Sequence, residues 1–303
     1  MKYDAFLALA LLSLAPAAHA ARNYNLSVNS NNAEGCADLR ATSKDGEVAQ
    51  INESATLGAR ELSALELEDN AGRSSVQVRG WDRAEYSVET CRIAVADSKS
   101  AAETLARGIT VSRSAGRLTT NGPSSTDGNW QVYFIVHAPR NANLDLQTKN
   151  GPISVEGVAG NIKVRAVNGP LALKNCGGQI DAHTTNGPIS FSGAGGDVIL
   201  TAQNGPILVD LTGDSWNGRQ LDAKTVNGPV SLSIPENYRS GVRLQTSGHA
   251  PLSCNVAACR SVVTDLRSSS ESRTIQLNGS ADTVRVQTSN GPVSVNGPRR
   301  RAI

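Results

Sequence analysis

Large aromatic side chains and methionine are scarce in this chain of 303 residues. It holds only 3 Trp, 5 Tyr, 3 Phe and a single Met, whereas glycine numbers 28. The apolar residues are therefore almost entirely Val, Ile, Leu and Ala, which suits thin, repetitive β-structure better than the thick mixed core of a globular enzyme. This composition favours one elongated body over two average domains.

Charged residues are also sparse, at 18% with a net charge of +2, and this excludes nucleic-acid binding driven by basic charge. Familiar catalytic motifs are missing: there is no Gly-x-Ser-x-Gly, no His-Glu-x-x-His, no Gly-x-Gly-x-x-Gly after a strand and no Gly-Lys pair. His137, His183 and His249 each lack a carboxylate or Cys at ligand spacing. We therefore expect no catalytic residue, no metal and no cofactor.

Long hydrophobic runs are absent after the first 20 residues, so no transmembrane segment is expected once that segment is removed. Residues 1–20 begin with Lys2, continue through an apolar run from Phe6 to Leu14, and end in Ala-His-Ala, a small-x-small pattern. This segment is typical of a cleaved secretory signal peptide. It predicts export to the periplasm, the cell surface or the exterior.

Five cysteines remain. In an oxidising compartment we expect Cys254 to pair with Cys259 and Cys36 with Cys91, which leaves Cys176 over, although the sequence does not fix this connectivity. For Cys176 we favour a small buried hydrophobe in a repeat turn over a reactive thiol.

The strongest pattern in the chain is the tripeptide Asn-Gly-Pro, which predicts a repeat architecture. It begins at Asn121, Asn150, Asn168, Asn186, Asn204, Asn227, Asn290 and Asn296, and the four copies from Asn150 to Asn204 are spaced by 18 residues. Aliphatic residues recur six and four positions before the Asn and three and five after it, so each repeat is strand, corner, strand and a Gly-rich turn. The repeat corners are Asn150, Gly151, Pro152, Asn168, Gly169, Pro170, Asn186, Gly187, Pro188, Asn204, Gly205, Pro206, Asn227, Gly228 and Pro229.

The proline of each corner decides between two folds. Asn-Gly between alternating strands is also a hairpin signal. In a two-residue hairpin, however, the residue after Gly must donate its N–H across the turn, and proline has none. We therefore predict an all-β protein, a parallel β-solenoid with coils of about 18 residues stacked at roughly 4.8 Å. The Asn side chains should form an amide ladder along one corner, and the Thr column of Thr148, Thr184 and Thr225 should point inward.

The repeats divide the chain into segments. We expect a signal peptide over 1–20, an irregular β-rich capping region over 21–130, solenoid repeats over 131–295 and a basic tail over 296–303. The capping region should contain one short helix from Ser98 to Arg107, with Asp97 or Ser98 as its N-cap. Between Asn204 and Asn227 the interval grows to 23 residues, so an insertion containing Trp216 should bulge out.

Two segments suggest a family. The run Gly80-Trp81-Asp82-Arg83, and Ala138-Pro139-Arg140 followed by the Thr-x-Asn-Gly-Pro-Ile-x-Val unit at 148–155, resemble the bacterial DUF4097 family. Members of this family are repetitive β-solenoid proteins that are labelled adhesins. The resemblance covers about residues 60–295 and implies a parallel β-solenoid with an adhesin-like role at or beyond the cell envelope. It carries over no catalytic residue.

A flat face of such a solenoid could present a ligand-binding strip. The outward positions five and three residues before each Asn supply its candidates, Asp145, Lys163, Arg165, Asp181, His183 and Lys224. Cross-strand charge pairing on a solvated face explains the same alternation of sign. The leading hypothesis is a non-catalytic binding or adhesion surface for a glycan or an envelope protein. The alternatives are a polysaccharide lyase or hydrolase and a purely structural envelope protein.

Overall fold

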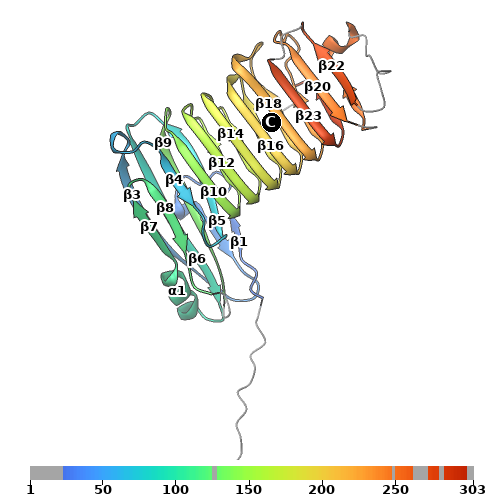
Figure 1. Cartoon of the computed structure of the whole chain (residues 1–303). Helices are drawn as coiled ribbons and strands as arrows, with labels where there is room; N and C mark the ends of the chain where they lie inside the picture. Colours follow the sequence, from blue (N-terminus) through green and yellow to red (C-terminus); the bar gives the residue numbers. More distant parts are fainter. Residues whose placement is uncertain (1–22, 125–127, 248–249, 262–271, 280–282, 299–303) are drawn as a thin grey trace, which may run out of the picture.

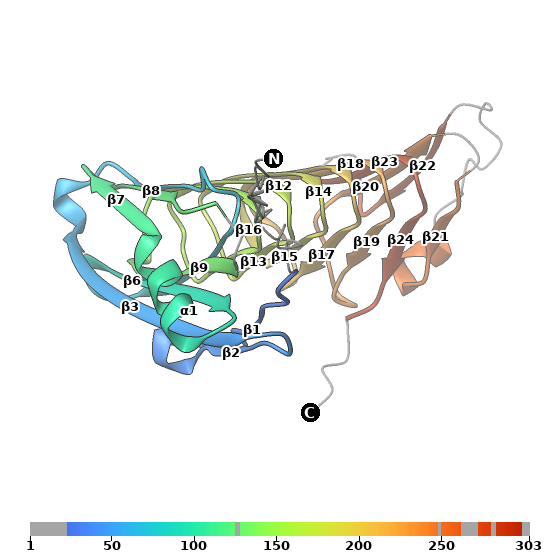
Figure 2. The same cartoon turned by 90° about the horizontal axis from the view of Figure 1, so that it is seen from below.

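The structure, a computed structural model, describes residues 23–124, 128–247, 250–261, 272–279 and 283–298. In this part of the chain the regular structure is almost entirely β-strand, and two long, largely parallel sheets face each other along an elongated body (Figure 1, Figure 2). The described elements include one α-helix, α1 (Lys99–Gly108), and three 3-10 helices, η1 (Cys36–Asp38), η2 (Ala59–Glu61) and η3 (Ala257–Ser261). The architecture is consistent with a solenoid-like fold.

Among the described residues each long sheet has 11 strands. Sheet 1 contains, in spatial order, β22 (Ser272–Leu277), β20 (Val242–Ser247), β23 (Val284–Asn290), β18 (Asn217–Asn227), β16 (Gly195–Asn204), β14 (Gln179–Asn186), β12 (Asn161–Asn168), β10 (Leu144–Asn150), β4 (Leu65–Glu68), β8 (Arg117–Asn121) and β7 (Thr110–Ser114). Sheet 2 contains β21 (Leu252–Cys254), β24 (Val293–Asn296), β19 (Val230–Ser233), β17 (Ile207–Leu211), β15 (Ile189–Gly193), β13 (Leu171–Lys174), β11 (Ile153–Glu156), β5 (Ser74–Trp81), β9 (Gly128–Pro139), β6 (Glu85–Ala96) and β3 (Glu47–Gly58). A small separate sheet joins β1 (Ser27–Asn29) to β2 (Arg40–Thr42).

The Asn-Gly-Pro corners connect a strand of sheet 1 to a strand of sheet 2, and successive strands within each sheet run parallel. Asn150, Asn168, Asn186 and Asn204 lie directly opposite one another in register. Parallel pairing, which the corner proline predicts, is thereby confirmed. The inward columns from both sheets meet in one continuous hydrophobic cluster between the sheets.

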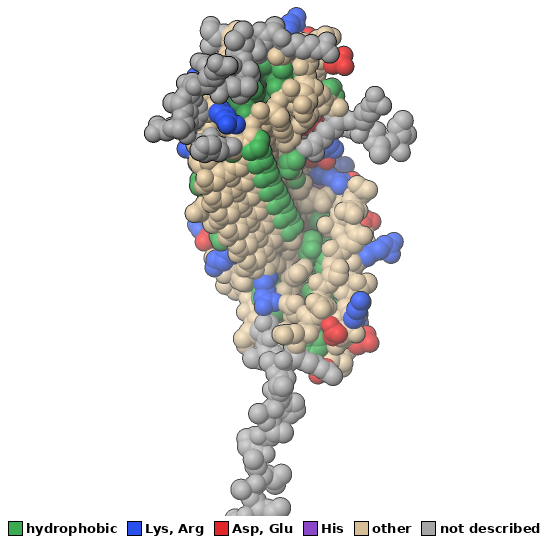
Figure 3. All heavy atoms as spheres, turned by 90° about the vertical axis from the view of Figure 1, so that its right-hand side faces the viewer, with side chains coloured by type: hydrophobic (Ala, Val, Ile, Leu, Met, Phe, Trp, Pro, Cys, Tyr) green, Lys and Arg blue, Asp and Glu red, His purple; other side chains and the backbone are tan. Residues whose placement is uncertain are grey.

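The corner asparagines form an unbroken chain of side-chain amides. Each Nδ2 donates to the Oδ1 of the asparagine on the neighbouring strand at 2.8–2.9 Å, and the first amide, that of Asn150, donates to the carbonyl of Gly72 at 3.0 Å. The amide ladder runs through Asn290, Asn227, Asn204, Asn186, Asn168 and Asn150. Figure 3 shows a continuous row of hydrophobic side chains that follows the long axis of the molecule.

The threonine and glycine of the repeat have packing roles at the same corner. The Thr side chains are buried, and the hydroxyls of Thr225 and Thr288 donate to corner glycine carbonyls at 2.9 and 2.8 Å. A Cβ atom added at Gly187 would overlap the carbonyl oxygen of Gly169, one strand earlier. The neighbouring backbones therefore approach each other too closely for any side chain at this position.

The N-terminal end is closed by antiparallel strands. β6 pairs with β9 and with β3 at the edge of sheet 2, and α1 packs on this layer with Ala102 and Ala106 buried. Ser98 is the N-cap of α1, since its hydroxyl accepts a hydrogen bond from the Ala101 N–H at 3.2 Å. β4 and β5 lie inside the segment expected to be capping structure, yet they already pair in parallel with β10 and β11, and on their other side with β8 and β9.

The N-terminal segment also covers the outer face of sheet 2. Its β1 and β2 lie below the sheet (Figure 2), where a second cluster of buried residues includes Leu39 and Ile135. A disulfide joins Cys36 to Cys91 on β6, with their Cα atoms 5.5 Å apart. A second disulfide joins Cys254 to Cys259 near η3, and Cys176 is a free, buried thiol.

The strand order at the C-terminal end departs from the order of the chain. β23 pairs with β18 on one side and with β20 on the other, and β24 likewise lies between β19 and β21. The last repeat, β23 and β24, therefore lies in space between the pair β18 and β19 and the pair β20 and β21, although both pairs precede it in the sequence. β22 then pairs antiparallel with β20 and forms the edge of sheet 1.

The expected bulge near Trp216 is met only in part, because residues on both sides of the tryptophan are exposed but the tryptophan is not. Trp216 does not bulge out: its side chain is only 6% exposed, its ring lies 6.1 Å from that of Phe191, and its Nε1 donates to the Gly196 carbonyl at 3.1 Å. A tryptophan buries a large apolar area, and its indole N–H finds a backbone acceptor here, so this residue anchors the insertion to the sheets while Gly213 and Asp214 stay exposed. The expected signal peptide and the arginines of the basic tail lie outside the described residues. No helix in the described part is long and apolar enough to span a membrane.

Candidate binding surface on sheet 1

The strip residues all lie on the outer face of sheet 1, because they alternate with buried aliphatic positions along each strand. Asp145, Lys163 and Asp181 stand in register on β10, β12 and β14, and Arg165 is in register with His183. Lys224 on β18 is separated from this group by β16, which presents the exposed Ile199. The strip is therefore a compact group of five residues with one outlying lysine.

Arg165 is the centre of this group. Its guanidinium lies 3.3 Å from a carboxylate oxygen of Asp181 on one neighbouring strand and 3.9 Å from one of Asp145 on the other. The two aspartates thus contact Arg165, diagonally across the strands, whereas Lys163 is their partner in strand register. All three side chains of this ion-pair group remain 32–48% exposed, so the group faces solvent and each pair contributes little to stability.

The polar face begins earlier than expected from the sequence. β4 adds Glu66 beside Asp145 and Glu68 beside Gln147, and Arg117 of β8 forms ion pairs with both glutamates. The repeat pattern contains a signal for these residues, since Leu-Glu-Leu-Glu at 65–68 has the same alternation as Leu-Asp-Leu-Gln at 144–147. That copy lacks its Asn-Gly-Pro and therefore escapes an alignment on the corner.

A hollow of about 300 Å³ lies beside Arg165 on this face. Its polar lining residues are Glu68, Asp69, Asn70, Gln147, Thr148, Lys149, Arg165 and His183. Asp69 and Thr148 are buried and bonded inside the protein, and the other six provide cationic donors, amide groups and a carboxylate acceptor within one shallow depression. The described residues contain no group of three His, Cys, Asp or Glu side chains placed to hold a metal ion.

The C-terminal part of the same face is more cationic. Arg285 of β23 lies 3.8 Å from Asp222 and donates to the Gln220 side chain at 2.7 Å, and it stands in register with Arg243. Asp222, Arg243 and Arg285 border a second hollow, of about 220 Å³. The charge of the face thus changes along the molecule, from mixed acid and base around Arg165 to predominantly basic around Arg285.

The corner residues from Asn150 to Pro229 lie along one edge of the two sheets rather than on this face. Their amide and backbone groups are engaged with one another, as the ladder and the glycine contacts show. They position the strands that present the strip. The free Cys176 belongs to the interior, and burial raises the pKa of its thiol, which keeps it protonated.

No protein-family model and no curated protein matches the sequence, so the resemblance to the DUF4097 family stays an expectation. Distant structural similarity exists to a candidate cell adhesion protein from Clostridium sporogenes (10% identity, 82% of this chain and 100% of that one, TM-score 0.34). A candidate adhesin from Bacteroides fragilis is also similar (7% identity, 82% of this chain and 97% of that one, TM-score 0.32). So is a candidate lipid-binding protein from Parabacteroides distasonis (10% identity, 83% of this chain and 99% of that one, TM-score 0.35). A functional assignment must therefore rest on the surface of this chain.

Proposed function

We propose that this chain is an adhesin-like, non-catalytic protein that binds a glycan with the outer face of sheet 1. In this proposal the two sheets are the faces of a parallel β-solenoid with coils of about 18 residues. The observation that carries the proposal is the exposed group of in-register polar side chains around Arg165, beside a hollow of about 300 Å³.

The chemistry of this group suits a sugar. Hydroxyl groups of a glycan both donate and accept hydrogen bonds, and the hollow offers amides, a carboxylate and cations for both roles. Arg165 has five N–H donors in a planar fork, and its contacts with the two aspartates hold that fork in place while it stays 43% exposed. A fixed guanidinium loses little conformational freedom when it binds a ligand.

The rigidity of the sheet supports the same conclusion. Each outward residue alternates with a fully buried one, and each strand pairs on both sides, so the spacing between neighbouring polar groups is set by the backbone at roughly 4.8 Å. A repeating polymer can contact several strands at once, and each additional contact then adds to its affinity. The aspartates nearest Lys163 are engaged with Arg165, an arrangement that favours binding over acid–base catalysis.

We also propose that the protein acts outside the cytoplasm. Its two disulfides, Cys36–Cys91 and Cys254–Cys259, are typical of oxidising compartments. The expected signal peptide agrees with periplasmic, cell-surface or extracellular placement.

A glycan array followed by pull-down with immobilised polysaccharides tests the binding function, using the chain without residues 1–20. The test variant is Arg165→Ala, and the matched control is Lys174→Ala, which removes an exposed cation and its ion pair with Glu156 on the outer face of sheet 2. We expect retention of specific glycans, a loss of about tenfold or more for Arg165→Ala, since it removes a charge-assisted contact, and no change for Lys174→Ala.

Two results would contradict the proposal. Release of unsaturated or shortened oligosaccharides from the polysaccharide would establish an enzyme instead. Absence of any retained glycan, or equal retention by the two variants, would favour the structural envelope role.

A further inference from the structure

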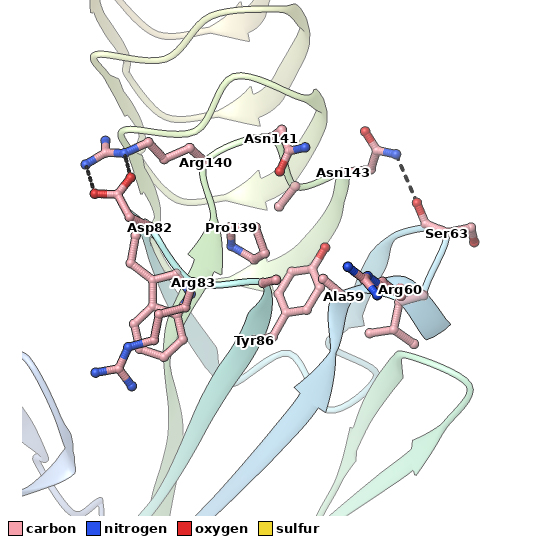
Figure 4. Close-up of a pocket in the computed structure, with 14 residues that line it drawn as sticks. Ala59, Arg60, Ser63, Asp82, Arg83, Tyr86, Pro139, Arg140, Asn141 and Asn143 are labelled. Atoms are coloured by element: carbon pink, nitrogen blue, oxygen red, sulfur yellow. Dashed lines mark hydrogen bonds and ion pairs between the residues drawn. The ribbon is translucent and has the colours of Figure 1, made fainter.

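A larger hollow, of about 520 Å³, lies where the N-terminal cap meets the first parallel strands (Figure 4). Three segments far apart in the sequence line it: residues 59–63 around η2, residues 81–86 between β5 and β6, and residues 139–143 between β9 and β10. Its apolar lining includes Leu62, Pro139 and Ala142, and polar side chains surround these. Its volume is in the range of small-molecule sites.

The two segments that carry the family resemblance meet at this hollow. Gly80 packs so closely on the Gly157 carbonyl that no Cβ atom fits between them, and Trp81, the next residue, lines the hollow. Trp81 is held by its Nε1, which donates to the Glu85 carbonyl at 2.8 Å, and by stacking on His137 with ring centroids 5.2 Å apart. This part of the wall is therefore rigid.

Asp82, the residue after Trp81, joins two of the segments that line the hollow. Asp82 accepts two hydrogen bonds from Arg140, at 2.5 and 3.4 Å, which link the β5–β6 connection to the β9–β10 connection (Figure 4). The Arg140 guanidinium lowers the pKa of Asp82, so this carboxylate is ionised at neutral pH. The charges of Asp82 and Arg140 thus compensate each other.

Two other polar groups at the hollow, the Tyr86 hydroxyl and the Arg60 guanidinium, have no such partner among the described residues. Tyr86 is only 3% exposed, its hydroxyl points into the hollow (Figure 4), and no described residue forms a hydrogen bond with that hydroxyl. Burial raises its pKa, so the hydroxyl keeps its proton and remains a donor. Arg60 lines the same hollow and forms no ion pair with the described part of the chain. The hollow therefore presents a hydroxyl donor and a guanidinium that are available to a ligand.

We infer that this hollow is a second binding site, for a single sugar residue that carries a carboxylate, such as a hexuronic acid. Its carboxylate would accept hydrogen bonds from Arg60, a ring hydroxyl or ring oxygen would accept one from Tyr86, and an apolar face of the sugar would pack on Pro139 and Ala142. This site lies at the junction with the cap and shares no residue with the strip around Arg165, so it does not depend on the function proposed for that strip.

Saturation-transfer NMR titrations of the chain without residues 1–20 test the inference with three probes: D-glucuronate, D-glucose and a short acetylated peptide with a free C-terminal carboxylate. We expect glucuronate to bind at least about tenfold more tightly than glucose, because only glucuronate brings a charge to Arg60. Arg60→Gln should remove this preference. Tyr86→Phe should weaken glucuronate binding by about threefold to tenfold.

Both variants should remain folded, since Arg60 is exposed and Tyr86→Phe removes only a hydroxyl without a described partner. Equal melting temperatures would establish this, and Arg107→Gln, an exposed change on α1, is the matched charge control. Tighter binding of the peptide than of glucuronate would assign the hollow to a protein terminus and overturn the inference. Unchanged glucuronate affinity in both variants, or no binding of any probe, would overturn it as well.

Discussion

The amide ladder allows a quantitative test by double substitution. Asn186 takes part in two ladder bonds, donating to Asn168 and accepting from Asn204, both at 2.9 Å. Because these amides are exposed, each bond should contribute about 0.5–1 kcal/mol, the lower part of the usual range. Asn186→Ala should therefore lower the free energy of unfolding by about 1–2 kcal/mol.

Double Asn→Ala variants should differ in additivity, depending on whether the two asparagines are neighbours in the ladder. Asn168→Ala and Asn186→Ala share one bond, so together they remove three ladder bonds where the single variants remove two each. Their combined effect should fall short of the sum by about 0.5–1 kcal/mol. Asn168→Ala and Asn227→Ala share no ladder bond and should add within about 0.3–0.5 kcal/mol.

Urea unfolding followed by circular dichroism, with the disulfides intact, measures all of these free energies. A neighbouring pair that is as additive as the distant pair would refute the idea that the ladder bonds stabilise the fold. Single variants without any effect would refute it too, and the corner would then depend on its glycines and prolines alone.

Three further predictions concern packing and charge. Ile189→Asp places a carboxylate at a fully buried position and should destabilise by more than about 4 kcal/mol, whereas Asp181→Ala on the outer face should cost less than about 1 kcal/mol; similar melting temperatures would contradict the assignment of faces. Gly187→Ala should lower the free energy of unfolding by about 1–3 kcal/mol, because the added Cβ meets the carbonyl of the preceding corner. Gly177→Ala, whose Cβ would lie 3.6 Å from its nearest neighbour, should be near neutral when both variants are unfolded in urea. Burial, together with neighbouring arginines, lowers the pKa of His137, so the unfolded chain binds the proton more readily than the folded chain. The free energy of unfolding should therefore fall as the pH drops below about 6.5, and His137→Gln should reduce that fall. An unchanged pH profile of stability in the variant would count against this assignment.

The corner of the repeat was readable from the sequence because single atoms decide its geometry. A proline that cannot donate excludes the hairpin, and an asparagine repeated in register must place amide beside amide. The inward and outward faces follow from alternation alone, which located the group around Arg165. The same reasoning fails where alternation is absent: β3, at 47–58, has only one buried residue, Ala49, and shows no strand pattern.

Other features depend on contacts that the sequence does not encode locally. Trp216 looked like part of an exposed insertion because Gly and Asp surround it, yet its partners, Phe191 and the Gly196 carbonyl, come from earlier repeats. The hollow near Tyr86 joins three segments that are not adjacent in the sequence, so no local pattern indicates it. The position of the last repeat was not predicted either, because the backbone edge of β18 can pair with any later strand; the one signal was the missing corner Asn in the repeat of β20, which cannot extend the amide ladder.

That position has a consequence for how the chain folds as it is synthesised. If each strand docked on the previous one as it emerged, β20 would occupy the edge of β18, where β23 belongs in the native order. The strands β20 and β22 can therefore dock only after the final residues of the chain have paired with β18, or they must leave the edge of β18 when those residues arrive. The C-terminal end is consequently the last part to reach its native arrangement, and a chain that ends early leaves the edge of β18 open to a strand from another molecule.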